Sequence, residues 1–401
     1  MTFMTKYIII LQNRRGMERY IFNECVYLSA GSRECLIEEL KNRKFRKVLL
    51  VTDDVIIKSG VAKKVSDVLD RGGYKYSIFY DIKPNPTVEN VQAGCRALKK
   101  SKADVIIAVG GGSVIDTAKA MSIIATNKSH IDVVSLAGAV KTENKAFPLI
   151  AMPTTSGTGA EVTINYVITD SIKQKKMVCV DPNDIPILSV VDAELMSSMP
   201  KGLTASTGMD ALTHAIESLI CKGATQFSDM FALESIRTIA KYLPVAYKDG
   251  NNIEAREKMA FAQYVVGMGF SNVGLGIVHS MAHPLGGRFD VAHGVANAML
   301  LPTVMKYNAE SDSKPKYRLI AECFGLKTSG CTDDKCVSMA VNAVKKLAKE
   351  LNIPTSLSEF GIELKDLDIL SEDAFNDICT GGNPRTTSVK DIKNLYKSLL
   401  K

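Results

Sequence analysis

Short apolar runs alternate with helical patterns through the first half of the chain. The runs are rich in Val and Ile, and each has the length of a buried strand: residues 47–53, 76–81, 104–113 and 148–154. Between them, Val61–Arg71 and Val88–Lys100 carry apolar residues at helical spacing. This alternation predicts a parallel, doubly wound sheet that is covered by helices.

The pattern changes near Pro200. Long helical patterns then dominate, at residues 207–220, 228–243, 253–266 and 335–351, and strand patterns almost disappear. A chain of 401 residues is too long for one small core. We therefore predict an N-terminal α/β domain with a parallel sheet over residues 17–200 and a C-terminal all-α domain over residues 201–401. A cleft between two such domains is where ligands usually bind.

The first residues do not fit this scheme. The stretch "MTFMTKYIIILQNRRGM" has a short apolar centre, but arginines follow it and no small-residue cleavage site is visible. It therefore fails as a secretory signal. We interpret residues 1–16 as an extension that is disordered or not native, and a targeting or docking peptide is the less favoured alternative.

Composition narrows the class of protein. The net charge is +7, but the lysines are dispersed and no basic segment is interleaved with aromatic residues, which argues against a nucleic-acid partner. No apolar stretch is long enough to span a bilayer. The nine cysteines form no CxxC pair, which is typical of reduced thiols in the cytoplasm. These features favour a cytoplasmic enzyme with a small-molecule partner.

A triple glycine follows one predicted strand. In "VGGGSVIDTAK", Gly111, Gly112 and Ser113 open a predicted helix. Glycines allow close approach of a ligand to the backbone, and a helix N-terminus offers free N–H groups to a pyrophosphate. The segment is neither GxGxxG nor a Walker sequence, so a plain strand–helix turn is an equally good reading of it alone.

Two neighbouring segments strengthen the nucleotide interpretation. Asp53 ends an earlier strand, where a carboxylate can bind an adenosine ribose and repel a 2′-phosphate, which favours NAD. Its alternative role is a helix N-cap. "PTTSGTGAE" offers Thr154, Thr155 and Thr158 to phosphates or a ribose, although it could also be a capped helix start. In "KPNPT", Asn85 could face the adenine, although most such turns are only punctuation.

Four of the five histidines lie near one acidic residue in the helical half. Asp210 and His214 are spaced i, i+4, and so are His279 and His283, which places each pair on one helix face. His293 follows ten residues later, beyond a Gly-Gly turn. Neutral imidazoles with one carboxylate suit Fe²⁺ or Zn²⁺. One such histidine would more often be a core residue, but four in this arrangement favour a catalytic metal site.

These motifs, in this order, resemble the iron-dependent group III alcohol dehydrogenases from about Met17 to the end. The resemblance implies Asp210, His214, His279 and His293 as metal ligands in a helical metal-binding domain, and NAD(H) as cofactor. It implies a two-domain, dehydroquinate synthase-like fold with an N-terminal dinucleotide-binding domain, and a homodimer. The cofactor site would comprise Asp53, Asn85, Gly111, Gly112, Ser113, Thr154, Thr155, Thr158, Asn165, Lys176 and His283.

Several segments are similar, nearly residue for residue, to family members that act on a three-carbon diol. They are "EVTINYVITD", "VCVDPNDIP", "QYVVGMGFSNVGLGIVHSMAHPLG" and "CTGGNPR". This implies lactaldehyde and 1,2-propanediol as the substrate pair, with a pocket formed by Asn165, Val167, Phe270, Leu275 and Cys379. Arg288 and Asp290 depart from the family pattern, which leaves 1,3-propanediol, ethanol and butanol dehydrogenases as alternatives.

The expected chemistry is hydride transfer at a carbon whose oxygen is polarised by the metal. We assign His283 as the candidate proton relay, because imidazole titrates near working pH; its alternative role is to hold the nicotinamide ribose. A metal-dependent hydrolase would use similar ligands, but it would not need two glycine- or hydroxyl-rich turns or Asp53. A non-catalytic metal-binding or scaffold protein is a further alternative, which the complete ligand set disfavours.

Overall fold

The computed structural model describes residues 18–400, so the predicted extension at residues 1–16 lies outside the described residues. The chain forms two compact units. The N-terminal unit comprises Tyr20–Met199 and Gly250–Tyr264, and the C-terminal unit includes Pro200–Asp249 and Val265–Lys401. Residues 250–264 thus belong to the first unit although they follow Pro200 in the chain.

The N-terminal unit is built on a six-stranded sheet in the order β1-β9-β6-β4-β2-β3, in which every pairing is parallel. This confirms the predicted parallel sheet. Its strands are β1 (Cys25–Leu28), β2 (Lys47–Val51), β3 (Lys75–Phe79), β4 (Val105–Gly110), β6 (Leu149–Pro153) and β9 (Leu188–Val191). All six residues of the central strand β4 are buried, as expected for a strand covered on both faces.

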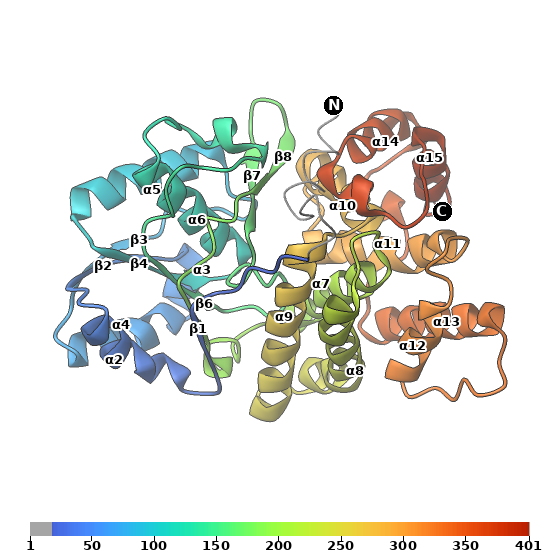
Figure 1. Ribbon diagram of the computed structural model, residues 1–401, viewed down its shortest axis with the longest axis horizontal. Coiled ribbons are helices and arrows are strands. Elements are labelled where there is room, and N and C mark those ends of the chain that lie inside the picture. The colour runs from blue at the N-terminus through green and yellow to red at the C-terminus, as the bar shows by residue number, and fades with distance from the viewer. Residues whose placement is uncertain (1–17, 401) are drawn as a thin grey trace. The chain divides into compact units, whose positions relative to one another are not determined.

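Helices cover both faces of this sheet (Figure 1). Alternate strand residues point to opposite faces, so Leu49 and Ile106 pack with α5 and α6, whereas Leu50 and Ile107 pack with α2 and α4. The helices of the unit are α2 (Leu36–Asn42), α3 (Asp54–Lys58), α4 (Val61–Arg71), α5 (Val88–Ser101), α6 (Gly112–Thr126) and the first part of α9 (Ile253–Val273), with short 3₁₀ turns η1 (Ser32–Cys35), η2 (Val133–Leu136) and η3 (Ala193–Leu195).

A second, three-stranded sheet in this unit was not predicted. It has the order β5-β8-β7, and its strands are β5 (Gly138–Ala139), β7 (Asn165–Asp170) and β8 (Lys175–Val180). Strands β7 and β8 form an antiparallel hairpin in which Asn165 lies opposite Val180. Buried and half-buried residues alternate along β7, as expected for a strand with one face on the core.

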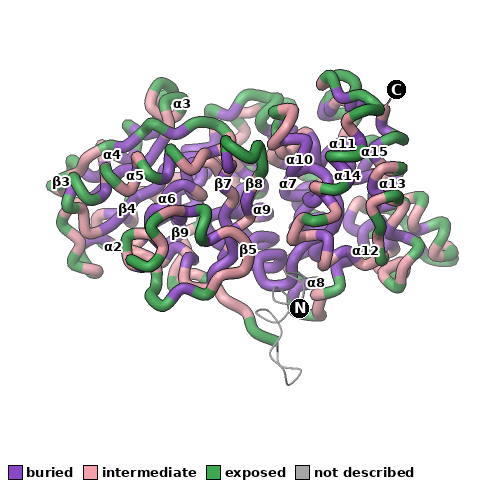
Figure 2. Tube along the Cα trace, turned by 90° about the horizontal axis from the view of Figure 1, so that it is seen from above, coloured by how far each residue is buried: buried purple, intermediate pink, exposed green. Residues whose placement is uncertain are grey.

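The C-terminal unit is helical in the described part of the chain. Its helices are α7 (Lys201–Ile220), α8 (Gln226–Lys248), the end of α9 (Ile253–Val273), α10 (Ile277–Phe289), α11 (His293–Asn308), α12 (Lys316–Cys323), α13 (Asp333–Glu350), α14 (Leu367–Phe375) and α15 (Val389–Lys397), with 3₁₀ turns η4 (Leu357–Phe360), η5 (Leu364–Asp366) and η6 (Ile378–Gly382). Helices α7 and α10 are buried along most of their length (Figure 2).

Helices α9 and α10 bear on two predictions, a Gly-Gly turn before His293 and the absence of a membrane-spanning stretch. The predicted Gly-Gly turn is wrong, because Gly286 and Gly287 lie inside α10. The chain turns instead after Phe289, where Asp290 adopts a left-handed conformation (φ 53°) as the helix C-cap. Between residues 18 and 400, no single helix is long and apolar enough to cross a membrane; only the bent pair α9 and α10 passes that test of length and composition together.

Candidate metal and nucleotide sites

Three helices of the C-terminal unit supply the predicted metal ligands. Helix α7 carries Asp210 and His214 one turn apart, α10 carries His279, and α11 begins at His293. Ligand atoms of Asp210, His279 and His293 all lie within 4.8 Å of one another. Residues 83 positions apart in the chain thus converge on one point.

The distances fit a common cation. Oδ1 of Asp210 lies 4.0 Å from Nε2 of His279 and 3.6 Å from Nε2 of His293. Two ligands that each lie about 2.1 Å from one ion can be at most about 4.2 Å apart, so both distances are compatible with shared coordination. Asp210 is 2% exposed, and a buried carboxylate beside neutral imidazoles favours a positive partner. The donor set therefore fits a divalent metal.

His214 lies beside this cluster but does not share in it. Its ring is 4.4 Å from the ring of His279 and stacks on Phe270, with ring centres 4.2 Å apart and planes at 10°. The stacking fixes the plane of the imidazole next to the three converging donors. The structure therefore brings three of the four predicted ligands together and places the fourth against one of them.

Two further polar residues contact the cluster, and the sequence did not identify them. Oε2 of Glu217 lies 2.6 Å from Nδ1 of His279. Nδ2 of Asn297 lies 2.7 Å from Oδ1 of Asp210 and 3.2 Å from Nε2 of both His279 and His293. Both side chains are buried, so their hydrogen bonds are shielded from water. Glu217 follows Asp210 by two helical turns, which is the one sequence feature that could have indicated it.

His283 has a separate partner. Its Nδ1 lies 2.8 Å from Oδ2 of Asp377, and its ring stacks on that of His293 at 5.5 Å. Burial by itself raises the pKa of Asp377, but the charge and hydrogen bond of His283 lower that pKa below its ordinary value. The result is a carboxylate that stays ionised and anchors one nitrogen of the imidazole.

The residues predicted to line the substrate pocket are divided between the two units. Phe270 stacks on His214, and the backbone oxygen of Leu275 lies close to Gly382 at the end of η6, which also carries Cys379. Burial raises the pKa of the Cys379 thiol, so this cysteine is held in its neutral form. Asn165 and Val167 lie on β7 of the N-terminal unit.

The glycine turn and the hydroxyl-rich segment lie side by side in the N-terminal unit. They follow the paired strands β4 and β6, and the N–H of Thr154 donates to Gly110 at 3.0 Å. A Cβ on Gly111 would lie 3.3 Å from Thr155, and one on Gly112 would lie 2.9 Å from Thr158. A side chain at either glycine would crowd these threonines, most severely at Gly112, and no helix begins within the described residues 154–164. The geometry fits a phosphate cradle at the N-terminus of α6.

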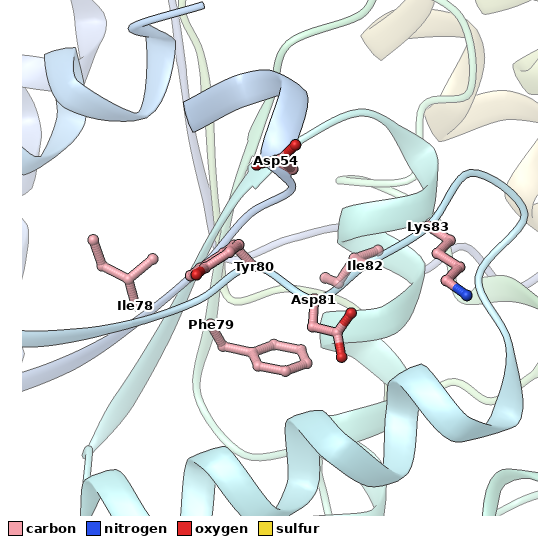
Figure 3. Close-up of a pocket in the computed structure, with 7 residues that line it drawn as sticks. All are labelled: Asp54, Ile78, Phe79, Tyr80, Asp81, Ile82 and Lys83. Atoms are coloured by element: carbon pink, nitrogen blue, oxygen red, sulfur yellow. The ribbon is translucent and has the colours of Figure 1, made fainter. Parts of the chain in front are cut away.

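Asp53 performs its alternative role as a helix cap. Its Oδ1 accepts the N–H of Ile56 at 2.8 Å at the start of α3. Beside it lies a cavity of about 510 Å³ (Figure 3). The cavity is lined by Asp54 from α3, by the last two residues of β3 and by residues 80–83, which follow that strand. This cavity is at the carboxyl ends of β2 and β3, where open parallel sheets bind ligands. Asn85 follows it in a left-handed conformation (φ 55°).

A buried lysine ties the glycine helix to β7. Nζ of Lys119, on α6, lies 2.6 Å from the carbonyl of Thr163, 2.7 Å from that of Asn165 and 3.7 Å from Oδ2 of Asp184. Burial lowers the pKa of Lys119 and raises that of Asp184. Lys176, a predicted cofactor residue, lies half-buried on β8. The sequence did not identify Lys119, although it ends the glycine motif.

Comparisons with known proteins identify the family of this chain. The model of the iron-containing alcohol dehydrogenases matches residues 23–193, and that of the C-terminal domain of Fe-containing alcohol dehydrogenases matches residues 204–400. Lactaldehyde reductase of Escherichia coli K12 is 46% identical over 94% of this chain and 98% of its own. 1,3-Propanediol dehydrogenase of Citrobacter freundii is 39% identical over 88% of this chain and 91% of its own.

Solved structures show the same fold. A crystal structure of 1,3-propanediol oxidoreductase superposes with a TM-score of 0.92 at 36% identity, covering 96% of this chain and all of that one. An alcohol dehydrogenase from Oenococcus oeni also superposes with a TM-score of 0.92, at 34% identity, covering 95% of this chain and 99% of that one. The hydrolase alternative finds no support among these relatives. The chain belongs to the iron-containing alcohol dehydrogenase family.

Proposed function

We propose that this enzyme interconverts lactaldehyde and 1,2-propanediol with NAD(H), using a metal held by Asp210, His214, His279 and His293. The observation that carries the proposal is the convergence of a carboxylate and two imidazoles in a chain 46% identical to a lactaldehyde reductase. Iron is the expected metal from the family, although the donor types also suit zinc. A cytosolic homodimer is part of the same proposal.

The bound metal supplies Lewis acidity to the substrate oxygen, and the nicotinamide supplies or accepts the hydride. The chain's own residues hold and orient these groups. Burial of Asp210 and His279 excludes water from the donors, which strengthens their electrostatic effect. Phe270, Leu275, Cys379, Asn165 and Val167 are proposed to contact the substrate, with Asn165 also contacting the cofactor.

His283 is proposed to move the proton that accompanies hydride transfer. Reduction of an aldehyde adds a hydride to carbon and leaves an oxygen that must gain a proton. The hydrogen bond to Asp377 engages Nδ1 of His283, so Nε2 is the atom that can give up or take that proton. Asp377 supports this role because it can offset the positive charge of the protonated ring.

The cofactor is proposed to bind the N-terminal unit. Its pyrophosphate would meet the N–H groups of Gly111, Gly112 and Ser113 at the start of α6, beside the hydroxyls of Thr154, Thr155 and Thr158. Its adenosine would occupy the cavity near Asp53 and Asn85, with Lys176 as a further contact. The charge of Asp53 favours NAD(H) over the phosphorylated cofactor.

Metal analysis combined with a substrate panel tests the proposal. The protein is purified without oxygen, its metal is quantified, and loss of NADH absorbance is followed with L-lactaldehyde, butanal and 3-hydroxypropanal. We expect near-stoichiometric iron and a preference for lactaldehyde. Preference for butanal or 3-hydroxypropanal would leave the family assignment intact and refute lactaldehyde as the substrate.

A variant pair tests the metal assignment. His279→Ala should lose bound metal and activity together, whereas His130→Ala, which alters a histidine of the N-terminal unit, should retain both. Absence of NADH oxidation by metal-loaded protein would refute the dehydrogenase assignment. Retention of metal by His279→Ala would refute the ligand set.

A further inference from the structure

We propose that Glu217 is a positioning residue of the metal centre, which holds His279 so that its Nε2 is the metal-binding atom. The same carboxylate caps the helix that carries His279. The inference rests on the proposed function, because it takes His279 as a metal ligand. It adds a residue that controls metal affinity without touching the metal.

The geometry assigns a different donor to each oxygen of Glu217. Oε2 lies 2.6 Å from Nδ1 of His279, and Oε1 accepts the backbone N–H of Val278 at 2.7 Å. The N–H of His279 is a weaker third donor, 3.4 Å from Oε2. Glu217 is 2% exposed, so water does not replace these partners. Both oxygens of the carboxylate are therefore committed as acceptors.

The backbone contact compensates for a missing cap. Helix α10 begins after Gly276, which has no side chain to accept from the first-turn N–H groups. Those groups and the helix dipole favour a negative charge at this position, and Glu217 supplies it from α7. Capping therefore holds the carboxylate of Glu217 at the N-terminal end of α10, in the same helical turn as the proposed metal ligand His279.

The contact with Nδ1 decides which nitrogen of His279 is available. An ionised carboxylate only accepts, so Nδ1 must carry the proton, and Nε2 of the neutral ring then presents its lone pair. Nε2 is the atom that lies 4.0 Å from Oδ1 of Asp210. Carboxylates behind metal-bound histidines typically fix the ring in this way, and their loss costs about 10- to 100-fold in metal affinity.

Gly276 provides an independent observation. A Cβ at this position would lie 2.8 Å from Oε1 of Glu217 and 3.0 Å from Oδ1 of Asn383. Any larger residue would therefore push against the carboxylate of Glu217. The close packing around Glu217 thus depends on a glycine at the helix start.

Glu217→Gln separates the two tasks of the side chain. Glutamine has nearly the same shape but offers one acceptor and one donor, so it cannot accept from both Val278 and His279. With its oxygen on Val278 the cap survives, and its amide donates to Nδ1, which forces the proton of His279 onto Nε2. We expect the metal-free variant to unfold near the wild-type temperature and to bind Zn²⁺ about 10- to 100-fold more weakly.

The measurement is competition for Zn²⁺ between metal-free protein and a chromophoric chelator, with thermal unfolding of the same samples. Glu234→Gln, at a half-exposed site on α8 of the same unit, is the matched control and should bind like wild type. Gly276→Ala should also weaken binding, since it displaces the carboxylate without removing it. If Glu217→Gln does not fold, the Zn²⁺ affinity of Gly276→Ala tests the positioning role of Glu217.

The outcomes separate this inference from the proposed function. Wild-type affinity in both Glu217→Gln and Gly276→Ala would overturn the positioning role and leave the metal centre intact. The same holds if Glu217→Gln lowers only the unfolding temperature, because that is the result of a cap alone. A wild-type chain that binds no Zn²⁺ would overturn the metal centre and this inference together.

Discussion

The stability of this protein should depend on pH through Glu161, at the end of the hydroxyl-rich segment. The side chain is fully buried, and Nε2 of Gln263 donates a hydrogen bond to its Oε1. Burial raises the pKa of Glu161 from its ordinary 4.5 to about 7, although Gln263 and the charge of Lys119 act in the opposite direction. The folded chain thus holds a proton that the unfolded chain releases at lower pH.

The sign and size follow from this difference. Between pH 4.5 and about 7 the folded state binds more protons at Glu161 than the unfolded state, so the free energy of unfolding falls as pH rises. The contribution is fully present below 4.5 and is lost as pH rises through about 7. The difference of about 2.5 pKa units corresponds to about 3 kcal/mol. Glu161→Gln keeps a hydrogen-bonding side chain of the same shape but cannot ionise.

Thermal unfolding of wild type and Glu161→Gln from about pH 5 to about pH 8 tests this reasoning. The wild type should lose stability relative to the variant as pH rises, by roughly 6–12 °C at about 2–4 °C per kcal/mol for a unit of this size. Other titrating groups, including Asp116 and Asp184, are present in both proteins and cancel in the comparison. Parallel curves for the two proteins would refute a proton on buried Glu161.

Substitutions at three further residues have defined outcomes. Asp53→Asn should keep the cap of α3 and the unfolding temperature but raise activity with NADPH relative to NADH. Asp53→Ala should raise the same ratio and also cost about 1 kcal/mol of stability. An unchanged ratio of NADPH to NADH activity in both variants would make Asp53 only a cap. Lys119→Met should cost about 3–5 kcal/mol in urea unfolding, because it leaves the carbonyls of Thr163 and Asn165 without their donor and Asp184 without its partner. A loss of stability below about 1 kcal/mol would contradict these contacts. His283→Asn should lower turnover at normal metal content, and normal turnover would refute the relay.

The central strands were predictable because their environment is uniform. Strand β4 is buried on both faces, so its sequence is a continuous apolar run that local reading detects. The hairpin of β7 and β8 was missed because its residues alternate between the core and a half-buried face, and Asn165, Thr169 and Asp170 interrupt the apolar signal. Its segments were recognised only by resemblance, which said nothing of their secondary structure.

The same contrast explains the metal site. Asp210 and His214 could be paired from the sequence because i, i+4 spacing on a helix is a local relation, as could His279 and His283. Glu217 and His279 are 62 residues apart, and His283 and Asp377 are 94 apart. Such pairs depend on how α7, α10 and η6 pack, which no local spacing encodes.

Lys119 shows a third limit, which concerns residue type rather than distance. A lysine at the end of a helical motif is ordinarily solvated, so its sequence context favours an exposed position. Here α6 is covered on nearly all sides, and the ammonium instead meets the carbonyls of Thr163 and Asn165. The burial that hides such a residue from sequence analysis also makes each of its contacts costly to lose, because water cannot replace them. Substitution of Lys119 should therefore cost more stability than substitution of a solvated lysine on a helix surface.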